Sequence, residues 1–169
     1  MWTLWEPGSM TNQEMLASML TVASHGKEVL HGQALGGKPI FFIVGDEPSQ
    51  RDFLIGRPFS GPLGPVLSSA MMTLEKAYAA TPDDCYLTYV VKSIFKPGEL
   101  TEDMVMKEWV PAIQLEYALS GCSKLVAVGK MARALAPQLT VKPVLLETPH
   151  RPVLERAKQA WKILLNGVA

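Results

Sequence analysis

Charged side chains follow four short apolar runs of the chain, each at the carboxyl end of its run. Asp46 and Glu47 follow the first run, Lys92 closes the second, Lys130 follows the third, and His150 follows the fourth. A carboxylate can hold a water molecule or balance a developing positive charge, and a histidine can donate a hydrogen bond to a departing group. These side chains could therefore form a hydrolytic site if the fold brings them to one edge. Each of them could equally be a solvated surface residue.

The four runs are rich in β-branched and aromatic residues, which predicts strands. Segments with helical spacing lie between them, including the stripe formed by Leu67, Met71, Leu74 and Tyr78. Such alternation predicts a three-layer α/β/α fold with a four-stranded parallel sheet, and in open sheets of this class ligands bind beyond the carboxyl ends of the strands. The predicted strands are 40–45, 86–92, 124–129 and 141–147.

Four helical segments are predicted, and their ends carry recognisable signals. Thr101, followed by two acidic residues, is a suitable N-cap for the helix that contains Val105 and Trp109. Pro111 lies inside that helix and is expected to kink or split it. Further helices are predicted between residues 11 and 30, around the stripe 67–78, and over 153–165, the last ending at Asn166 and Gly167.

The length of 169 residues fits one domain, with residues 1–39 as an N-terminal helical extension and 40–165 as the core. A hydrophobic content of 48% with 19% charged residues is typical of an ordinary globular protein, and no apolar run reaches the roughly 20 residues that cross a bilayer. The start of the chain lacks the pattern of a signal peptide. We expect a cytoplasmic monomer without a membrane contact.

The formal net charge is zero, but its distribution is uneven. Residues 1–119 carry 8 Lys and Arg against 14 Asp and Glu, whereas residues 120–169 carry 8 against 2. The C-terminal part could therefore hold a polyanion on its own, although two solvated faces of different charge explain the same numbers. The two cysteines, Cys85 and Cys122, are too few for a disulfide framework, so we expect buried free thiols.

Four motifs occur in a recognisable order. The first is Ile43-Val44-Gly45-Asp46-Glu47-Pro48-Ser49 followed by Gly56-Arg57-Pro58-Phe59-Ser60-Gly61, and the second is Tyr86-Leu87-Thr88-Tyr89-Val90-Val91-Lys92-Ser93. The third is Lys124-Leu125-Val126-Ala127-Val128-Gly129, and the fourth is Thr148-Pro149-His150-Arg151-Pro152. Over about residues 40–165 the chain resembles the uracil-DNA glycosylase superfamily, nearest its bacterial and archaeal iron–sulfur-type branch (family 4).

The resemblance implies roles for residues of three loops. It implies that His150 stabilises the oxygen of the departing base, and that Asp46 or Asp52 holds the hydrolytic water or stabilises an oxocarbenium-like sugar. Phe59 would stack on a base flipped out of the helix. The alternatives are a core phenylalanine and a surface histidine that caps the last helix. The expected substrate-binding residues are Gly45, Glu47, Phe59 and Tyr89.

The resemblance also implies contacts with DNA. Leu154 occupies the place of the family's wedge loop, which enters the minor groove, but it could equally be the first core residue of the final helix. Basic side chains near the site would contact phosphates, although each could be plain solvated surface. The expected DNA-binding residues are Arg57, Lys92, Lys130, Arg151, Leu154 and Arg156.

The chain departs from this branch at two sets of positions. Members of the branch hold an iron–sulfur cluster with four cysteines, but Ser93 stands at one of those positions and Trp109 lies near another. Cluster ligation needs thiolates, so we expect no cluster, no metal and no cofactor. Tyr89 replaces the asparagine that pairs with uracil, and Glu47 adds charge to the same loop, so uracil need not be the target.

Two functions follow as hypotheses. The first, which we favour at this point because both polar loops persist, is a diverged DNA glycosylase that removes uracil or another modified pyrimidine by hydrolysis of the N-glycosidic bond. The second is a catalytically inactive protein of the same fold that binds DNA or a replication or repair partner. A weaker third option is an enzyme that acts on a free nucleoside or nucleotide. The sequence has no phosphate loop of the G-x-x-x-x-G-K-[ST] type, which argues against nucleotide hydrolysis.

Overall fold

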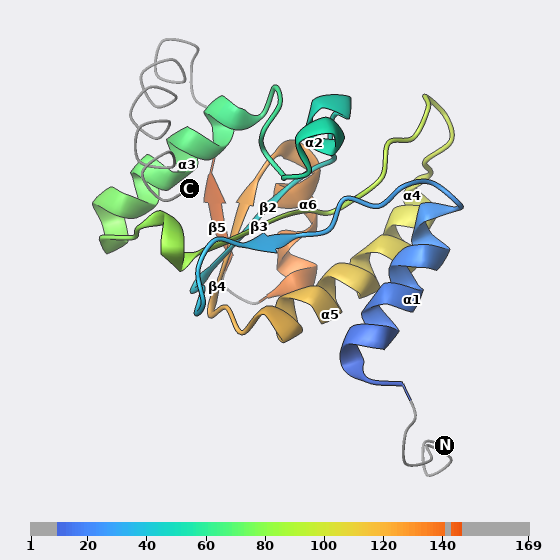
Figure 1. The fold of residues 1–169 in the computed structure, drawn as a ribbon, viewed down its shortest axis with the longest axis horizontal. Coiled ribbons are helices and arrows are strands. Elements are labelled where there is room, and N and C mark those ends of the chain that lie inside the picture. Colours follow the sequence, from blue (N-terminus) through green and yellow to red (C-terminus); the bar gives the residue numbers. More distant parts are fainter. Residues whose placement is uncertain (1–9, 141–142, 147–169) are drawn as a thin grey trace.

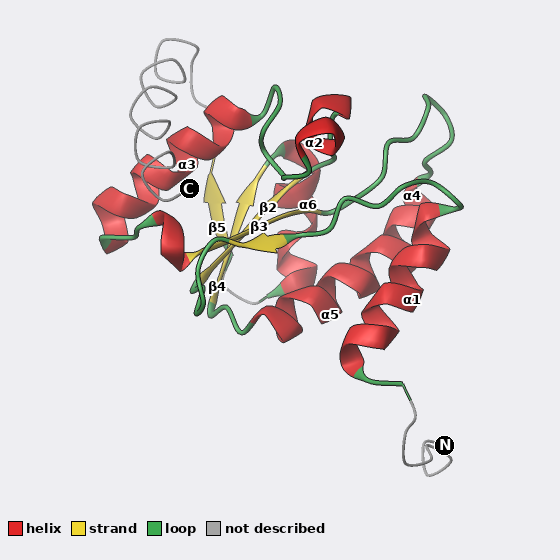
Figure 2. Cartoon of the chain, in the orientation of Figure 1, coloured by secondary structure: helices red, strands yellow, loops and turns green. Residues whose placement is uncertain are grey.

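The computed structural model describes residues 10–140 and 143–146 of the chain (Figure 1). Helices lie on both sides of a central sheet (Figure 2), which confirms the predicted α/β/α class. The strands are β1 (Gln33–Ala34), β2 (Phe41–Gly45), β3 (Cys85–Tyr89), β4 (Lys124–Val128) and β5 (Val144–Leu146). The helices are α1 (Asn12–Ser24), α2 (Gln50–Ile55), α3 (Gly64–Tyr78), α4 (Glu102–Met104), α5 (Val110–Ser120) and α6 (Lys130–Leu139).

The sheet has five strands in the order β1-β3-β2-β4-β5. The four strands from β2 to β5 are mutually parallel, as predicted, with Gly45 of β2 opposite Tyr89 of β3. β1 was not predicted; it is a two-residue strand that pairs antiparallel with β3 and makes the sheet mixed. A strand of two residues has no hydrophobic alternation that a sequence pattern could reveal.

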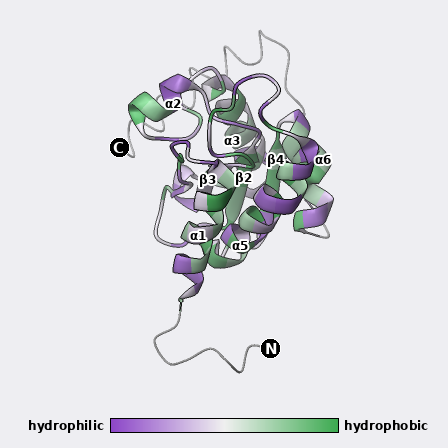
Figure 3. Cartoon of the chain, turned by 90° about the vertical axis from the view of Figure 1, so that its right-hand side faces the viewer, coloured by the Kyte–Doolittle hydropathy of each residue, from purple (hydrophilic) through white to green (hydrophobic). Residues whose placement is uncertain are grey.

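Alternate residues of β2 face two different helical layers. Phe42 and Val44 belong to the hydrophobic cluster that contains residues of α1, α5 and α6, whereas Phe41 and Ile43 belong to the cluster on the α3 side. The strand is buried on both faces, so it reads in sequence as a continuous apolar run. Figure 3 shows hydrophobic strands between helices whose polar turns lie on the outside.

The starts of two helices agree with the predictions, although α1 ends at Ser24 and not near residue 30. Thr11 and Thr101 both act as N-caps, each side-chain oxygen accepting a hydrogen bond from a backbone N–H three residues further on. A π-helical turn, Val105–Trp109, separates α4 from α5, and Pro111 lies in the first turn of α5. Proline cannot donate to the preceding turn, which favours a change of helix type at this point.

Some predicted elements are shorter in the structure or fall outside its described part. β3 ends at Tyr89 rather than at Lys92, although Val90 and Val91 still donate backbone hydrogen bonds to Gly45 and Asp46 at 2.9 and 3.0 Å. The helix predicted over 153–165 lies outside the described residues. No helix in the described ranges is long and apolar enough to cross a membrane.

Candidate functional site at the carboxyl edge of the sheet

Asp46 lies directly after β2 and faces the start of α6. Its Oδ1 atom accepts a hydrogen bond of 2.8 Å from the backbone N–H of Ala132, in the first turn of that helix. The positive end of the helix dipole stabilises a carboxylate at this position. Asp46 is only partly buried. The structure therefore places a fixed, solvent-accessible carboxylate where β2 and β4 end.

Gly129, the residue between β4 and α6, makes this approach possible. A Cβ atom at position 129 would lie 2.4 Å from Oδ1 of Asp46, and the backbone has a φ of 157°, which side chains rarely adopt. Only glycine allows the carboxylate to come this close to the helix start. Sequence analysis placed Gly129 at the strand end but gave it no role in holding Asp46.

Asp52 has a different environment, although it lies only six positions further along the chain. It is 1% exposed and belongs to the first turn of α2. Oδ1 accepts hydrogen bonds from the backbone N–H groups of Ser60 and Gly61 at 2.9 and 2.8 Å and from the Ser60 hydroxyl at 3.3 Å. Oδ2 accepts from the Ser49 N–H at 3.0 Å and the Tyr89 hydroxyl at 2.7 Å.

These contacts argue against the catalytic role expected for Asp52. A carboxylate has about four acceptor positions, and protein donors occupy both oxygens of Asp52 in a buried setting. A catalytic carboxylate must reach a water molecule or the sugar, and this one has no exposed oxygen with which to do so. Asp52 instead ties α2 to the loop that carries Phe59, and Asp46 is the carboxylate that stays accessible.

Phe59 and Tyr89 pack against each other beside the end of β2. Their ring centroids are 4.9 Å apart at an interplanar angle of 32°, and the two residues are 3% and 0% exposed. A Cβ atom on Gly45 would lie 2.9 Å from the Phe59 ring and 3.2 Å from the Tyr89 ring. Glycine at position 45 is therefore required by the two rings.

The backbone of Phe59 is in the left-handed region, with a φ of 61°. A non-glycine residue keeps this conformation only where its surroundings fix it. Here the N–H of Phe59 donates a 2.8 Å hydrogen bond to the Tyr89 hydroxyl, which in turn donates to Asp52. Burial raises the pKa of Tyr89, and the hydrogen bond to Asp52 raises that pKa further, so the hydroxyl keeps its proton. Tyr89 thus joins Asp52 to the Phe59 loop.

This geometry changes the role expected for Tyr89. We expected its hydroxyl among the substrate-binding groups, but the donor is used by Asp52 and an acceptor position is used by Phe59. Phe59 does lie at the predicted strand edge, with one face of its ring covered by Tyr89. A flipped base cannot stack on that face while Tyr89 occupies it.

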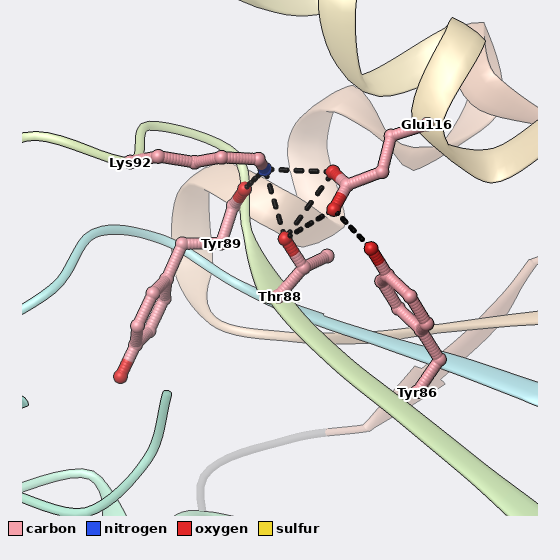
Figure 4. A network of polar contacts seen from close by, with 5 residues as sticks. All are labelled: Tyr86, Thr88, Tyr89, Lys92 and Glu116. Atoms are coloured by element: carbon pink, nitrogen blue, oxygen red, sulfur yellow. Dashed lines mark hydrogen bonds and ion pairs between the residues drawn. The ribbon is translucent and has the colours of Figure 1, made fainter. Parts of the chain in front are cut away.

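Lys92 is the centre of a buried polar network on the other side of β3. Its Nζ atom lies 2.7 Å from Oε1 of Glu116, donates to the Thr88 hydroxyl at 2.8 Å, and donates to the carbonyl oxygen of Tyr89. Glu116 also accepts from Thr88 and, at 2.8 Å, from the Tyr86 hydroxyl. Figure 4 shows Lys92 and Tyr86 reaching the Glu116 carboxylate from different directions, with the ring of Tyr89 pointing away from it.

Lys92 therefore does not offer its ammonium group to DNA, contrary to the expected phosphate contact. The residue is 1% exposed, and burial lowers the pKa of its ammonium group while Glu116 opposes that shift. A phosphate would reach Nζ only after the ion pair with Glu116 had separated. The network instead fixes the carboxyl end of β3, because Lys92 bonds both to Thr88 and to the backbone of Tyr89.

Some of the remaining predicted site residues are exposed, and others lie outside the described part of the structure. Glu47, Arg57 and Lys130 are exposed, so their side chains are accessible to a ligand. Four predicted residues lie outside the described part of the structure: His150, Arg151, Leu154 and Arg156. The structure brings Asp46 and Phe59 to the same strand end, through their shared neighbour Gly45.

Ser93 and Trp109, which stand at or near positions of cluster cysteines in the branch that the sequence resembles, have other partners in this structure. The Ser93 hydroxyl donates a 2.8 Å hydrogen bond to the carbonyl oxygen of Glu28. Trp109 is fully buried and meets the edge of Phe95, with ring centroids 6.3 Å apart. A hydroxyl and an indole cannot replace thiolate ligands. Cys85 and Cys122 are both free thiols. Cys85 is buried as expected, whereas Cys122 is half-buried.

Sequence analysis gave no role to Glu116. This acidic residue lies on the same face of α5 as Ala112 and Ile113, both of which are buried. A carboxylate at the spacing of an apolar helical stripe signals a buried partner, because an uncompensated buried charge is costly. That signal was present in the sequence, whereas the identity of the partner, Lys92, depends on the fold.

Comparison with known proteins identifies a family for this chain. No curated protein matches the chain in a sequence search. Residues 36–165 match the family model described as the uracil DNA glycosylase superfamily. That range covers β2, β3 and β4 together with the loops that carry Asp46 and Phe59. Membership of this superfamily implies DNA as a substrate or partner. The chain belongs to the uracil DNA glycosylase superfamily.

Proposed function

We propose that this protein binds DNA through the carboxyl edge of its sheet and that Tyr89 prevents it from excising uracil. The observation that carries the proposal is the packing of Tyr89 on Phe59, at 4.9 Å between ring centroids. In the branch that the sequence resembles, an asparagine at position 89 pairs with uracil. Here a larger ring fills that position and covers one face of the aromatic residue on which the base would stack.

The hydrogen-bonding capacity of Tyr89 supports the same conclusion. An asparagine amide offers a donor and an acceptor side by side to the edge of uracil, whereas a phenol offers a single hydroxyl. That hydroxyl already donates to Asp52 and accepts from the N–H of Phe59. A base entering this position would have to break both contacts and displace a buried ring. The unsatisfied buried groups left behind would cost about 1–3 kcal/mol each.

Exposed cations support DNA binding at this edge. Arg57 lies two positions before Phe59, and Lys130 follows Gly129 at the start of α6, and both side chains are exposed. Phosphate contacts from such residues supply much of the affinity of DNA-binding proteins and make that affinity depend on salt. The superfamily match provides the independent reason to consider DNA.

A second candidate function is a DNA glycosylase that acts on a base other than uracil. The observation that favours it is Asp46, which keeps a partly exposed carboxylate at the end of β2, anchored to α6 through Ala132. A carboxylate held in this way can stabilise an oxocarbenium-like sugar or position a water molecule. In this candidate Asp46 and His150 are the catalytic residues.

The test measures base release and DNA binding by the same preparation. The wild-type protein is expected to bind single-stranded uracil-containing DNA, with an affinity that falls as salt rises, and to release no uracil. Release of uracil by the wild-type protein would refute the proposed block. Release of a different base from a panel of modified oligonucleotides, lost in Asp46→Asn and His150→Ala, would establish the second candidate.

Two substitutions at position 89 separate the ring from its hydroxyl. Tyr89→Phe keeps the ring on Phe59 and should remain unable to release uracil. Tyr89→Asn restores the family's residue and removes the ring, so we expect uracil to enter and weak excision to appear. Because loss of a large buried ring costs about 3–5 kcal/mol, folding of both variants is checked by thermal unfolding. Excision by Tyr89→Phe at the level of Tyr89→Asn would contradict a steric block.

A further inference from the structure

A concave site lies beside the Phe59 loop, near the edge strand β1. It is a cavity of about 650 Å³ between the end of α2, the loop 56–62 and the start of α3. Leu35, just after β1, and Leu87 of β3 line its sheet side. The side-chain amide of Gln33 donates a 3.0 Å hydrogen bond to the carbonyl oxygen of Gly56 and so fixes β1 to the end of α2. The cavity is therefore built by contacts between separate elements.

Two arginines, Arg51 and Arg57, line this cavity, and no Asp or Glu is among its described lining residues. Both arginines are exposed. Within the described part of the chain, neither guanidinium takes part in an ion pair or hydrogen bond. The nearest carboxylate in sequence, Asp52, is buried and used by the Phe59 loop. Two guanidinium groups without an acidic partner favour an anion, and the guanidinium fork matches the geometry of a phosphate.

The inner wall of the cavity is apolar. Leu67 of α3 and Leu87 are 4% and 1% exposed, and Phe59 lines the same space. Small-molecule sites typically occupy about 300–1,000 Å³ and combine an apolar lining with a few polar groups. A site with an apolar wall and a cationic rim fits a ligand that joins a flat apolar group to an anionic group.

We propose that this cavity binds one nucleotide unit, with the base against Leu35 and above the buried Leu67 and Leu87, and the phosphate between Arg51 and Arg57. The cavity shares Phe59 and Arg57 with the strand edge that carries Asp46 and Tyr89, whereas Arg51 and Leu35 line the cavity only. The nucleotide comes from one of two sources, a flanking nucleotide of a bound DNA strand or a free mononucleotide. If the nucleotide belongs to a DNA strand, the inference rests on the proposed function. If it is a free mononucleotide, the inference does not depend on the proposed function.

The first experiment measures binding of labelled single-stranded and duplex oligonucleotides by fluorescence anisotropy at several salt concentrations. Arg51→Ala and Arg57→Ala are each expected to lower the affinity and to reduce the slope of log K against log salt by about 1, as expected for loss of one phosphate contact. Leu35→Trp, which fills the cavity without removing charge, is expected to weaken the single strand more than the duplex. Lys76→Ala is the matched control, because it removes an exposed cation from the last turn of α3, away from the cavity.

The second experiment uses the free ligand. Thymidine monophosphate and inorganic phosphate are titrated separately into the isotopically labelled full chain and followed by NMR. The nucleotide is expected to shift the methyl signals of Leu35, Leu67 and Leu87, whereas inorganic phosphate shifts only signals of Arg51 and Arg57. Leu35→Trp should abolish the methyl shifts and leave the phosphate response in place.

The outcomes separate this inference from the proposed function. Arg51→Ala and Leu35→Trp test the cavity alone, because the proposed function also uses Arg57. If DNA binds, neither of these two variants changes that binding, and the nucleotide gives no methyl shifts, the cavity inference is wrong and the proposed function stands. If no DNA binds, the proposed function fails, and the nucleotide titration alone decides the cavity. Methyl shifts with unchanged DNA binding by the variants would identify the free nucleotide as the source.

Discussion

At the scale of single residues, two aspartates close together in sequence have opposite roles because their surroundings differ. Asp46 is partly exposed and receives one backbone hydrogen bond from α6, whereas Asp52 is 1% exposed and receives hydrogen bonds on both oxygens. Residue type alone made both of them candidates for catalysis. Burial and hydrogen-bond partners leave only Asp46 accessible to a substrate.

Replacing Asp52 should loosen the loop that carries Phe59. Asp52→Ala removes the acceptor for the N–H groups of Ser49, Ser60 and Gly61, and each buried donor left without a partner costs about 1–3 kcal/mol. We expect the free energy of unfolding to fall by about 3 kcal/mol or more, measured by urea titration. Asp52→Asn keeps one carbonyl acceptor and should lose less. Equal stability of Asp52→Ala and the wild type would contradict a structural role.

Replacing Gly129 should disturb Asp46 specifically. Gly129→Ala introduces a Cβ atom 2.4 Å from Oδ1 of Asp46 and forces a backbone that costs about 1–3 kcal/mol for a side chain. Gly121→Ala is the control, because Gly121 also has a positive φ but no atom within 4 Å of the added Cβ. We expect Gly129→Ala to destabilise the protein more than the control. In a double-mutant cycle Asp46→Ala should relieve part of that difference, and strict additivity would argue against the clash.

At the scale of elements, β3 is held between two polar networks. On one side Tyr89 reaches Asp52 and the Phe59 loop, and on the other side Lys92 reaches Glu116 of α5 and the backbone of Tyr89. The carboxyl end of this strand is therefore fixed from both faces of the sheet. The proposed function depends on the position of the Tyr89 ring, and these contacts hold the ring in that position.

Breaking the Lys92–Glu116 pair should destabilise the protein strongly. Lys92→Met leaves the Glu116 carboxylate buried without its cation, and such changes typically cost about 3–5 kcal/mol. The double variant Lys92→Met with Glu116→Leu removes both charges and should be more stable than Lys92→Met alone. Lys107→Met is the control, since its pair with Asp103 is exposed and should contribute less than about 1 kcal/mol. A loss for Lys92→Met no larger than that control would refute the importance of the buried pair.

At the scale of the whole molecule, buried hydroxyl and thiol groups predict sensitivity to alkaline pH. Burial raises the pKa of Cys85 to about 12 from an ordinary value of 9.0, and burial with the neighbouring carboxylates Glu116 and Asp52 raises the pKa values of Tyr86 and Tyr89 above their ordinary 10.0. These groups lose protons more readily in the unfolded chain. Their contribution to stability is therefore complete below about pH 9. It begins to be lost above pH 9 for Cys85 and above pH 10 for the two tyrosines, and the loss continues until the pH passes the raised pKa of each group in the folded protein.

We expect the free energy of unfolding to fall above pH 9, by up to about 1.4 kcal/mol per pH unit for each group that titrates only in the unfolded chain. Lys92 changes the free energy of unfolding in the opposite direction. Because its pKa is lowered in the folded protein, the unfolded chain binds more protons than the folded protein up to about pH 10.5, and stability rises with pH in that range. Urea titrations between pH 8 and 11 measure the summed effect of these groups on the free energy of unfolding. Tyr89→Phe and Cys85→Ala should each flatten the decline, and an unchanged slope in both would contradict the assignment.

The sequence by itself determined the class of fold, the order of the parallel strands along the chain, and the superfamily, because these depend on local hydrophobic patterns and on motifs at fixed spacing. It also identified the loops that carry Asp46 and Phe59. Tertiary structure decided which of the two aspartates is accessible, that Lys92 is buried against Glu116, and that Tyr89 covers Phe59. Exposure, ion pairing and ring packing depend on residues far apart in sequence, such as Lys92 with Glu116 and Phe59 with Tyr89, and no local pattern records those distances.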